Sequence, residues 1–303
     1  MLTVLLGLSG ALAYGFADFA GGVAAKTRRP LVVTTLTSTI GILPLLIGLL
    51  ILGGRFTPAA VVWGSVAGLS GSVGVLLLYA VLARGPMSVL SPVTSVFAAV
   101  LPVVVALALG ARLSLLATAA MVVAILAVIL VSAAKDRSGA RLTLRSVLMA
   151  ATAGCGFGGL ILAYDMTSPR DGIAPLVVAR VMQALLMTAA LLVTRRRSAV
   201  LVSGVVAPAV VVSGASSAPR VNRGFWLIVI ACGVLDASAN VFIQAALHSS
   251  ADPATLPVVS VLNALYPVGT IILASIILRE RLTPVQIGGI SLGIATSVVL
   301  ALT

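Results

Sequence analysis

Long apolar stretches separated by short gaps, with basic residues gathered in every second gap, constrain this chain more than any other feature. About ten stretches are long enough to cross a bilayer as a helix, which takes roughly 20 apolar residues. Lysine and arginine collect in the cytoplasmic loops of membrane proteins. The pattern therefore predicts a multi-pass protein of the cytoplasmic membrane with both termini outside. The basic residues of the alternate gaps are Lys26, Arg28, Arg29, Arg84, Lys135, Arg137, Arg141, Arg145, Arg195, Arg196, Arg197, Arg220, Arg223, Arg279 and Arg281.

The gaps also divide the chain into two halves. The basic segment 135–145 predicts a hinge between residues 1–140 and residues 141–303, with five helices in each half. Segment 195–223 holds an apolar run, 199–212, that is too short to span. We expect it to be an amphipathic or loosely ordered cytoplasmic segment, with a re-entrant loop as the alternative. The expected membrane helices cover 3–25, 31–53, 60–83, 87–109, 113–134, 146–166, 174–194, 224–247, 254–278 and 284–302.

The composition excludes several classes of function. Hydrophobic residues make up 60% of the chain and charged residues 9%, whereas a soluble domain carries about 25% charged residues. No polar segment is long enough to form a catalytic module outside the membrane, so we do not expect an enzyme. The net charge of +12 lies in short runs at helix ends. Such runs suit contact with anionic lipid, and we expect no nucleic-acid partner.

The few cysteine and histidine residues predict neither a metal site nor a cofactor. Cys155 and Cys232 lie inside apolar stretches, unlike a disulfide framework or a metal motif. His248 stands alone at a helix end, as an interface residue. Residues 1–14 are apolar without a basic start, and the apolar run continues beyond them. We therefore expect a first membrane helix there and not a cleaved signal.

The two halves resemble each other. A shift of 165 residues aligns 80–103 with 245–268 and places Pro92 on Pro257, Ser95 on Ser260 and Pro102 on Pro267. Because each half has an odd number of spans, the second half is expected to sit upside down relative to the first. Inverted repeats of this kind let a transporter alternate between the two faces of the membrane. The prediction is an all-α membrane protein of ten helices in two inverted five-helix repeats.

Several local patterns resemble the EamA family of the drug/metabolite transporter superfamily. They are the Tyr14-Gly15 pair, the prolines of the fourth and ninth spans, and the run Leu278-Arg279-Glu280-Arg281-Leu282-Thr283-Pro284 followed by Gly288, Gly289 and Gly293. The resemblance covers essentially the whole chain and implies a small-molecule transporter. One departure concerns the Glu that ends both the fourth and ninth spans in this family. Glu280 matches it, but position 111 is Ala, which favours a structural role for the Glu.

The eighth span carries the clearest polar pattern. Asp236, Asn240 and Gln244 follow one another at four-residue intervals, which places them on one helix face. Charged and strongly polar side chains cost about 2.5–3.5 kcal/mol at the centre of a membrane helix on insertion scales. This stripe therefore faces other helices or a cavity. Cavity lining is the favoured interpretation, and hydrogen bonds between helices are the alternative.

Further polar residues lie inside other spans. Asp18 resembles a cavity residue of the family and follows Tyr14 by one turn; alternatively it reaches the interface or caps Gly21-Gly22. Arg180, with Gln183 beside it, needs a carboxylate such as Asp236 or Asp165, or binds an anionic group of the substrate. Asn263 and Tyr266, which precede Pro267, are two further candidates for the cavity wall.

These features predict a secondary transporter of a small polar or amphipathic metabolite. An exporter with alternating access is favoured, driven by protons or by exchange, because nothing resembles a nucleotide-binding loop. A buried Asp tends to keep its proton. Asp236 is therefore the first candidate for a proton carrier, and Asp18 is the second. An exchanger or uptake carrier without protons is the alternative, and a channel or intramembrane enzyme is less favoured. The expected partners are substrate, lipid and protons, with a monomer or homodimer as the assembly.

Overall fold

The computed structural model describes residues 1–83, 87–112, 114–132, 143–203, 223–277 and 283–302. These residues are almost entirely helical, and a helix lies within a few residues of each of the ten expected ranges. The all-helical prediction is confirmed. The helices are α1 (Leu2–Thr27), α2 (Pro30–Ile40), α3 (Ile42–Leu52), α4 (Pro58–Leu82), α5 (Met87–Ala108), α6 (Leu115–Ser132), α7 (Leu144–Asp165), α8 (Ala174–Ser203), α9 (Arg223–Leu247), α10 (Thr255–Asn263), α11 (Tyr266–Ile277) and α12 (Pro284–Leu302).

Helix starts follow local sequence chemistry. Thr57 caps α4 by accepting a hydrogen bond from the backbone N–H of Ala60 at 3.1 Å, and Pro58 occupies the first turn, where no amide donor is required. Thr143 and Ser146 form a reciprocal capping box at the start of α7. These caps fix where each apolar run begins to coil.

Two of the ten expected spans are broken in the middle. The second is divided at Gly41 into α2 and α3. The ninth is divided between Asn263 and Tyr266, immediately before Pro267, which supplies no amide donor to a continuous helix. By contrast, α5 runs unbroken through Pro92 and Pro102. Pro102 and Pro267 occupy matched positions of the two halves. The helix is interrupted just before Pro267, whereas it is continuous at Pro102.

The helix of the seventh span continues beyond the expected end of the span. α8 continues from Ala174 to Ser203, so residues 195–203 are helical and do not begin a gap. The remainder of the expected cytoplasmic segment, 204–222, lies outside the described residues. So does Glu280.

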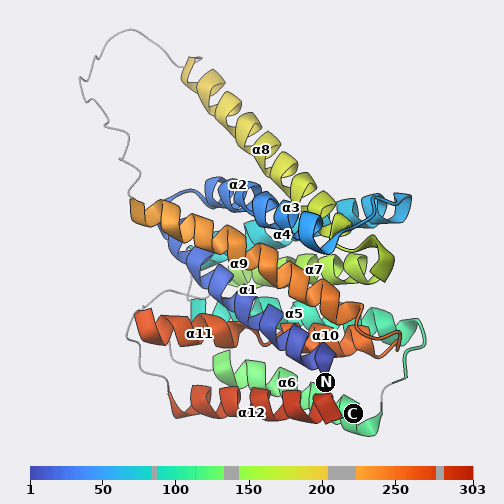
Figure 1. Ribbon diagram of the computed structural model, residues 1–303. Coiled ribbons are helices and arrows are strands. Elements are labelled where there is room, and N and C mark those ends of the chain that lie inside the picture. Colours follow the sequence, from blue (N-terminus) through green and yellow to red (C-terminus); the bar gives the residue numbers. More distant parts are fainter. Residues whose placement is uncertain (84–86, 113, 133–142, 204–222, 278–282, 303) are drawn as a thin grey trace.

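Helix packing joins the first and second halves of the chain closely. α1 packs against α9, α10 and α11, while α7 packs against α4 and α5. α2 packs against α8, and α6 lies beside α12 at one edge of the bundle (Figure 1). A Cβ atom at Gly15 would overlap the backbone carbonyl of Tyr266, so this glycine permits the close approach of α1 to α11. The N- and C-termini lie at the same end of the bundle (Figure 1).

The outer surface of the bundle is apolar. Large hydrophobic side chains such as Leu50, Ile51 and Leu115 are at least 75% exposed, as expected for side chains that face lipid. Among the described residues, six segments are long and apolar enough to cross a membrane by length and composition. They are Leu2–Thr27, Pro30–Leu52, Pro58–Leu82, Leu144–Asp165, Ala174–Arg195 and Arg223–Leu247.

Candidate functional site

An ion pair between α8 and α9 lies inside the bundle. One terminal nitrogen of the Arg180 guanidinium donates to the Asp236 carboxylate, and the other donates to Oε1 of Gln183 at 2.8 Å. The two charged side chains are 7% and 15% exposed. Of the two carboxylates expected as partners for Arg180, the structure brings Asp236 to it.

The polar stripe of α9 contacts α7. The hydroxyl of Tyr164 donates to Oδ1 of Asn240 at 3.1 Å, and Nδ2 of Asn240 donates to the backbone carbonyl of Asp236 at 2.7 Å. One turn further on, Nε2 of Gln244 lies 3.4 Å from Oγ1 of Thr167. These hydrogen bonds between helices are the alternative weighed for Asn240 and Gln244. They do not exclude a cavity wall, because Asn240 also borders one.

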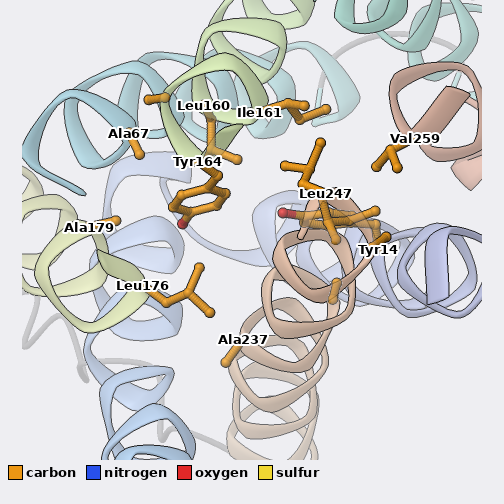
Figure 2. Packing of buried hydrophobic residues seen from close by; sticks show 14 of the residues in the cluster. Tyr14, Ala67, Leu160, Ile161, Tyr164, Leu176, Ala179, Ala237, Leu247 and Val259 are labelled. Carbon is orange, nitrogen blue, oxygen red and sulfur yellow. The ribbon is translucent and has the colours of Figure 1, made fainter. Parts of the chain in front are cut away.

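A small cavity lies beside the ion pair. It offers about 20 Å³ to the centre of a water-sized sphere, which is room for about one water molecule. The rings of Tyr14 and Tyr164 enter this interior from α1 and α7 (Figure 2). The wall is built from α1, α4, α7, α8 and α9. Its residues are Tyr14, Ala67, Gly68, Gly71, Val75, Phe157, Leu160, Tyr164, Ala179, Arg180, Gln183, Asp236 and Asn240.

A second cavity also has Tyr14 in its wall. It measures about 10 Å³ on the same scale, and Asp18, Asn263, Tyr266 and Ile161 line it. The two cavities share Tyr14, Phe157 and Leu160 as lining residues. We call the first cavity the ion-pair compartment and the second the acid compartment. Tyr14 and two apolar residues belong to the walls of both.

Polar atoms in the acid compartment lack partners. Asp18 is 5% exposed, and no hydrogen bond or ion pair reaches its carboxyl group from the part of the chain that the structure describes. Oδ1 of Asn263 is buried without a hydrogen-bond partner, and so is the hydroxyl of Ser91. The hydroxyl of Tyr266 donates to the backbone carbonyl of Ser91 at 3.1 Å. A buried polar group without a partner is costly, so Asp18 and Asn263 require an explanation.

A larger hollow opens at the end of the bundle where the termini lie. It offers about 350 Å³ and is bordered by Asp165, Thr167, His248 and Asp252, among others. Nε2 of His248 lies 3.4 Å from Oγ1 of Thr167, and burial lowers the pKa of His248 below its ordinary value. The outer hollow and the α9 stripe thus meet at Thr167.

Sequence reasoning missed several residues of this site. Tyr164 and Thr167 were overlooked because a single Tyr or Thr near a helix end gives no periodic signal. Gly41 was also missed: a Cβ at this position would lie 3.2 Å from Nε of Arg180 and 3.1 Å from the carbonyl oxygen of Gly233. The absence of a side chain at Gly41 therefore makes room for Arg180. Within the described ranges, no three His, Cys, Asp or Glu side chains come together as a metal site would require.

The fold is shared with solved structures. Twenty-nine solved chains match this one. One crystal structure of a protein matches with a TM-score of 0.67 and 17% sequence identity, covering 99% of this chain and 96% of the other. A likeness at this identity shows a common fold alone. No curated protein matches the chain.

The family comparison is more specific. The model of the EamA-like transporter family matches residues 144–302, which is more than half of the chain. This match agrees with the multi-pass helical structure and with the resemblance found in the sequence, and the family is one of transporters and not of enzymes. The chain belongs to the EamA-like transporter family.

Proposed function

We propose that this protein is a secondary transporter that carries a small polar or amphipathic metabolite across the cytoplasmic membrane by alternating access, in the direction of export. The observation that carries the proposal is the buried Arg180–Asp236 ion pair at the wall of an interior cavity. Charged groups inside a membrane protein mark substrate or ion pathways. The guanidinium binds an anionic group of the metabolite, and the Asp236 carboxylate binds a cationic or hydrogen-donating group.

The pattern of helix packing supports two inverted repeats, residues 1–140 and 141–303. In the first half α1 packs against α9 and α10–α11, and in the second half α7 packs against α4 and α5. Exchanging each helix for its counterpart turns the first set of contacts into the second. Each half therefore packs against the other through equivalent helices, as expected for a carrier whose halves exchange conformations.

The sizes of the cavities support a closed central site. A metabolite does not fit in about 20 Å³, whereas the hollow at the end with the termini offers about 350 Å³. Asn240, Gln244 and Thr167 form the polar connection between them. In this conformation the α9 stripe closes the route, and separation of α7 from α9 opens it outward.

The driving force is a proton gradient or an exchange of substrates. If Asp236 carries the proton, that proton competes with the Arg180 guanidinium, which donates to one oxygen of this carboxylate. Exchange without protons is the second candidate. A bound metabolite would pair with Arg180 and Asp236 in place of their ion pair. If a second metabolite binds as the first one leaves, neither side chain is left as an unpaired buried charge.

A metabolite comparison tests the function. Culture medium and cell contents are compared for cells that express the wild type, Asp236→Asn or nothing, with Arg170→Gln, which neutralises an exposed charge that does not line the cavities described above, as the control. A compound that accumulates outside with the wild type and the control, and not with Asp236→Asn, supports the proposal. Equal levels for all strains, with the protein present in the membrane, contradict export and lead to uptake and exchange assays with labelled compounds.

A further inference from the structure

The centre of the bundle holds two acids and one base. Asp18 and Arg180 are buried, the Asp236 side chain is 15% exposed, and each of the three lines one of the two small cavities. The guanidinium is already engaged by Asp236 and Gln183. If both acids were ionised, one negative charge would remain in the interior without a counter-charge, and such a charge is strongly unfavourable.

Among the residues that the structure describes, no basic side chain forms an ion pair with Asp18. The titratable groups that interact electrostatically with the Asp18 carboxyl group are Asp236 and Cys232 of α9, Tyr79 of α4, Tyr266 of α11 and Tyr14 of its own helix. Asp236 is the charged member of this group, and it repels a second carboxylate. Cys232 is occupied, because its Sγ lies 3.1 Å from the Tyr79 hydroxyl and 3.3 Å from the carbonyl of Ala17.

Asn263 indicates that a hydrogen-bond donor is missing from this cavity. Its Oδ1 atom is a buried acceptor without a donor, and it lines the same small cavity as Asp18. An ionised carboxylate only accepts hydrogen bonds, whereas a protonated one carries an O–H donor. One proton on Asp18 therefore supplies the donor that Asn263 lacks and removes the uncompensated charge. The cavity of about 10 Å³ is close to the size of one water molecule, which is enough for a single bridging water between the two groups.

We propose that Asp18 is the proton-binding residue of this transporter and that Asn263, at the C-terminal end of the broken helix α10, holds the proton by accepting its hydrogen bond. The mechanism rests on the proposed function, and it separates two tasks. Arg180 and Asp236 bind substrate in one compartment, and Asp18 binds the proton in the other. Tyr14 lines both cavities, so a substrate that displaces Tyr14 alters the surroundings of Asp18 directly.

The break in the ninth span provides the hinge that this proposal requires. Asn263 ends α10 and Tyr266 begins α11, so the two segments are joined by a short non-helical link against α1. A hinge movement here carries Asn263 away from Asp18 without unfolding either helix. Loss of the Asn263 acceptor then exposes the proton for release, which couples proton movement to the change between conformations.

The test reads the proton itself and needs no substrate. Infrared difference spectra of the purified full-length protein in lipid vesicles, taken across a pH titration, report the C=O stretch of a protonated carboxyl group. The wild type is expected to show this band at neutral pH, and Asp18→Asn to lose it. Asn263→Leu, which removes the acceptor, is expected to keep the band at a shifted frequency. Asp252→Asn, in an exposed loop, leaves it in place.

Two results overturn the proposal: a wild-type spectrum without the band at neutral pH, or a band that survives Asp18→Asn. If Asp18→Asn fails to fold, the Asn263→Leu shift decides the matter, because a band of another acid does not respond to that change. The spectra are independent of transport. A band that behaves as expected in a protein that exports no compound refutes the proposed function and leaves the proton site standing.

Discussion

Removing one partner of the Arg180–Asp236 ion pair should be far more damaging than removing both. The two side chains are 7% and 15% exposed, so neither is fully solvated when its partner is lost. Breaking a buried pair in this way typically costs about 3–5 kcal/mol, whereas replacing both partners with apolar residues of similar size is often neutral or stabilising. We expect Asp236→Asn to lower the free energy of unfolding by about 3 kcal/mol, the lower end of that range, because Gln183 still accepts from the guanidinium.

The two single variants are expected to differ. When Arg180 is replaced by Met, Asp236 can take up a proton and become neutral, while a guanidinium left without Asp236 cannot lose its charge. Arg180→Met should therefore be less destabilising than Asp236→Asn. The double variant Arg180→Met/Asp236→Leu should recover to within about 1 kcal/mol of the wild type, with transport abolished.

The assay is equilibrium unfolding of the purified protein by sodium dodecyl sulfate in mild detergent, followed by circular dichroism. The four proteins form a double-mutant cycle, in which the departure from additivity measures the coupling of the pair. Single variants that each cost less than about 1 kcal/mol would place the ion pair in the range of solvent-exposed pairs. The interior would then be wet in this conformation, and the argument for a closed central site would fail.

Four further predictions concern positions around the site. Gly41→Val should cost about 1–3 kcal/mol of stability through overpacking, because a Cβ added at Gly41 would lie 3.2 Å from Nε of Arg180. In the same unfolding assay the control Gly48→Ala should be nearly neutral, because the nearest atom to its added Cβ is 3.9 Å away. Asp171→Ala should cost about 1–3 kcal/mol, since this carboxylate accepts from Thr57 and from the backbone N–H of Ser168 at 3.0 Å each; an equal loss in the exposed variant Arg170→Ala would refute that role. Because burial lowers the pKa of His248, the unfolded chain binds its proton first, so stability should fall as pH drops below about 6.5; thermal melts of His248→Gln that keep the full slope of the wild type would contradict this. A C-terminal alkaline phosphatase fusion should be active, since this end is predicted to lie outside; a fluorescent C-terminal green fluorescent protein fusion would reverse the orientation.

The helical content could be read from the sequence because it depends on local properties. In lipid each backbone amide must be satisfied within its own segment, so an apolar run of sufficient length becomes a helix wherever it packs. The breaks could not be read in the same way. Pro267 follows the interruption of the ninth span, but Pro92 and Pro102 lie within an unbroken α5. Whether a proline breaks a helix depends on which neighbours satisfy the freed backbone groups, and those neighbours are set by packing.

For the candidate site, too, some features follow from single helices and others depend on how the helices pack. By itself the sequence determined that Asp236, Asn240 and Gln244 share a face and that Asp18 and Arg180 belong to apolar spans, since periodicity and hydropathy are properties of one helix. Only the tertiary structure decided that Arg180 pairs with Asp236 and not with Asp165, that Tyr14 lines two cavities, and that Asp18 shares one of them with Asn263. The physical reason is that such pairings depend on the rotation and depth of two helices relative to each other. These are fixed by close contacts such as Gly15 against Tyr266 and Gly41 against Arg180, which join residues far apart in the chain.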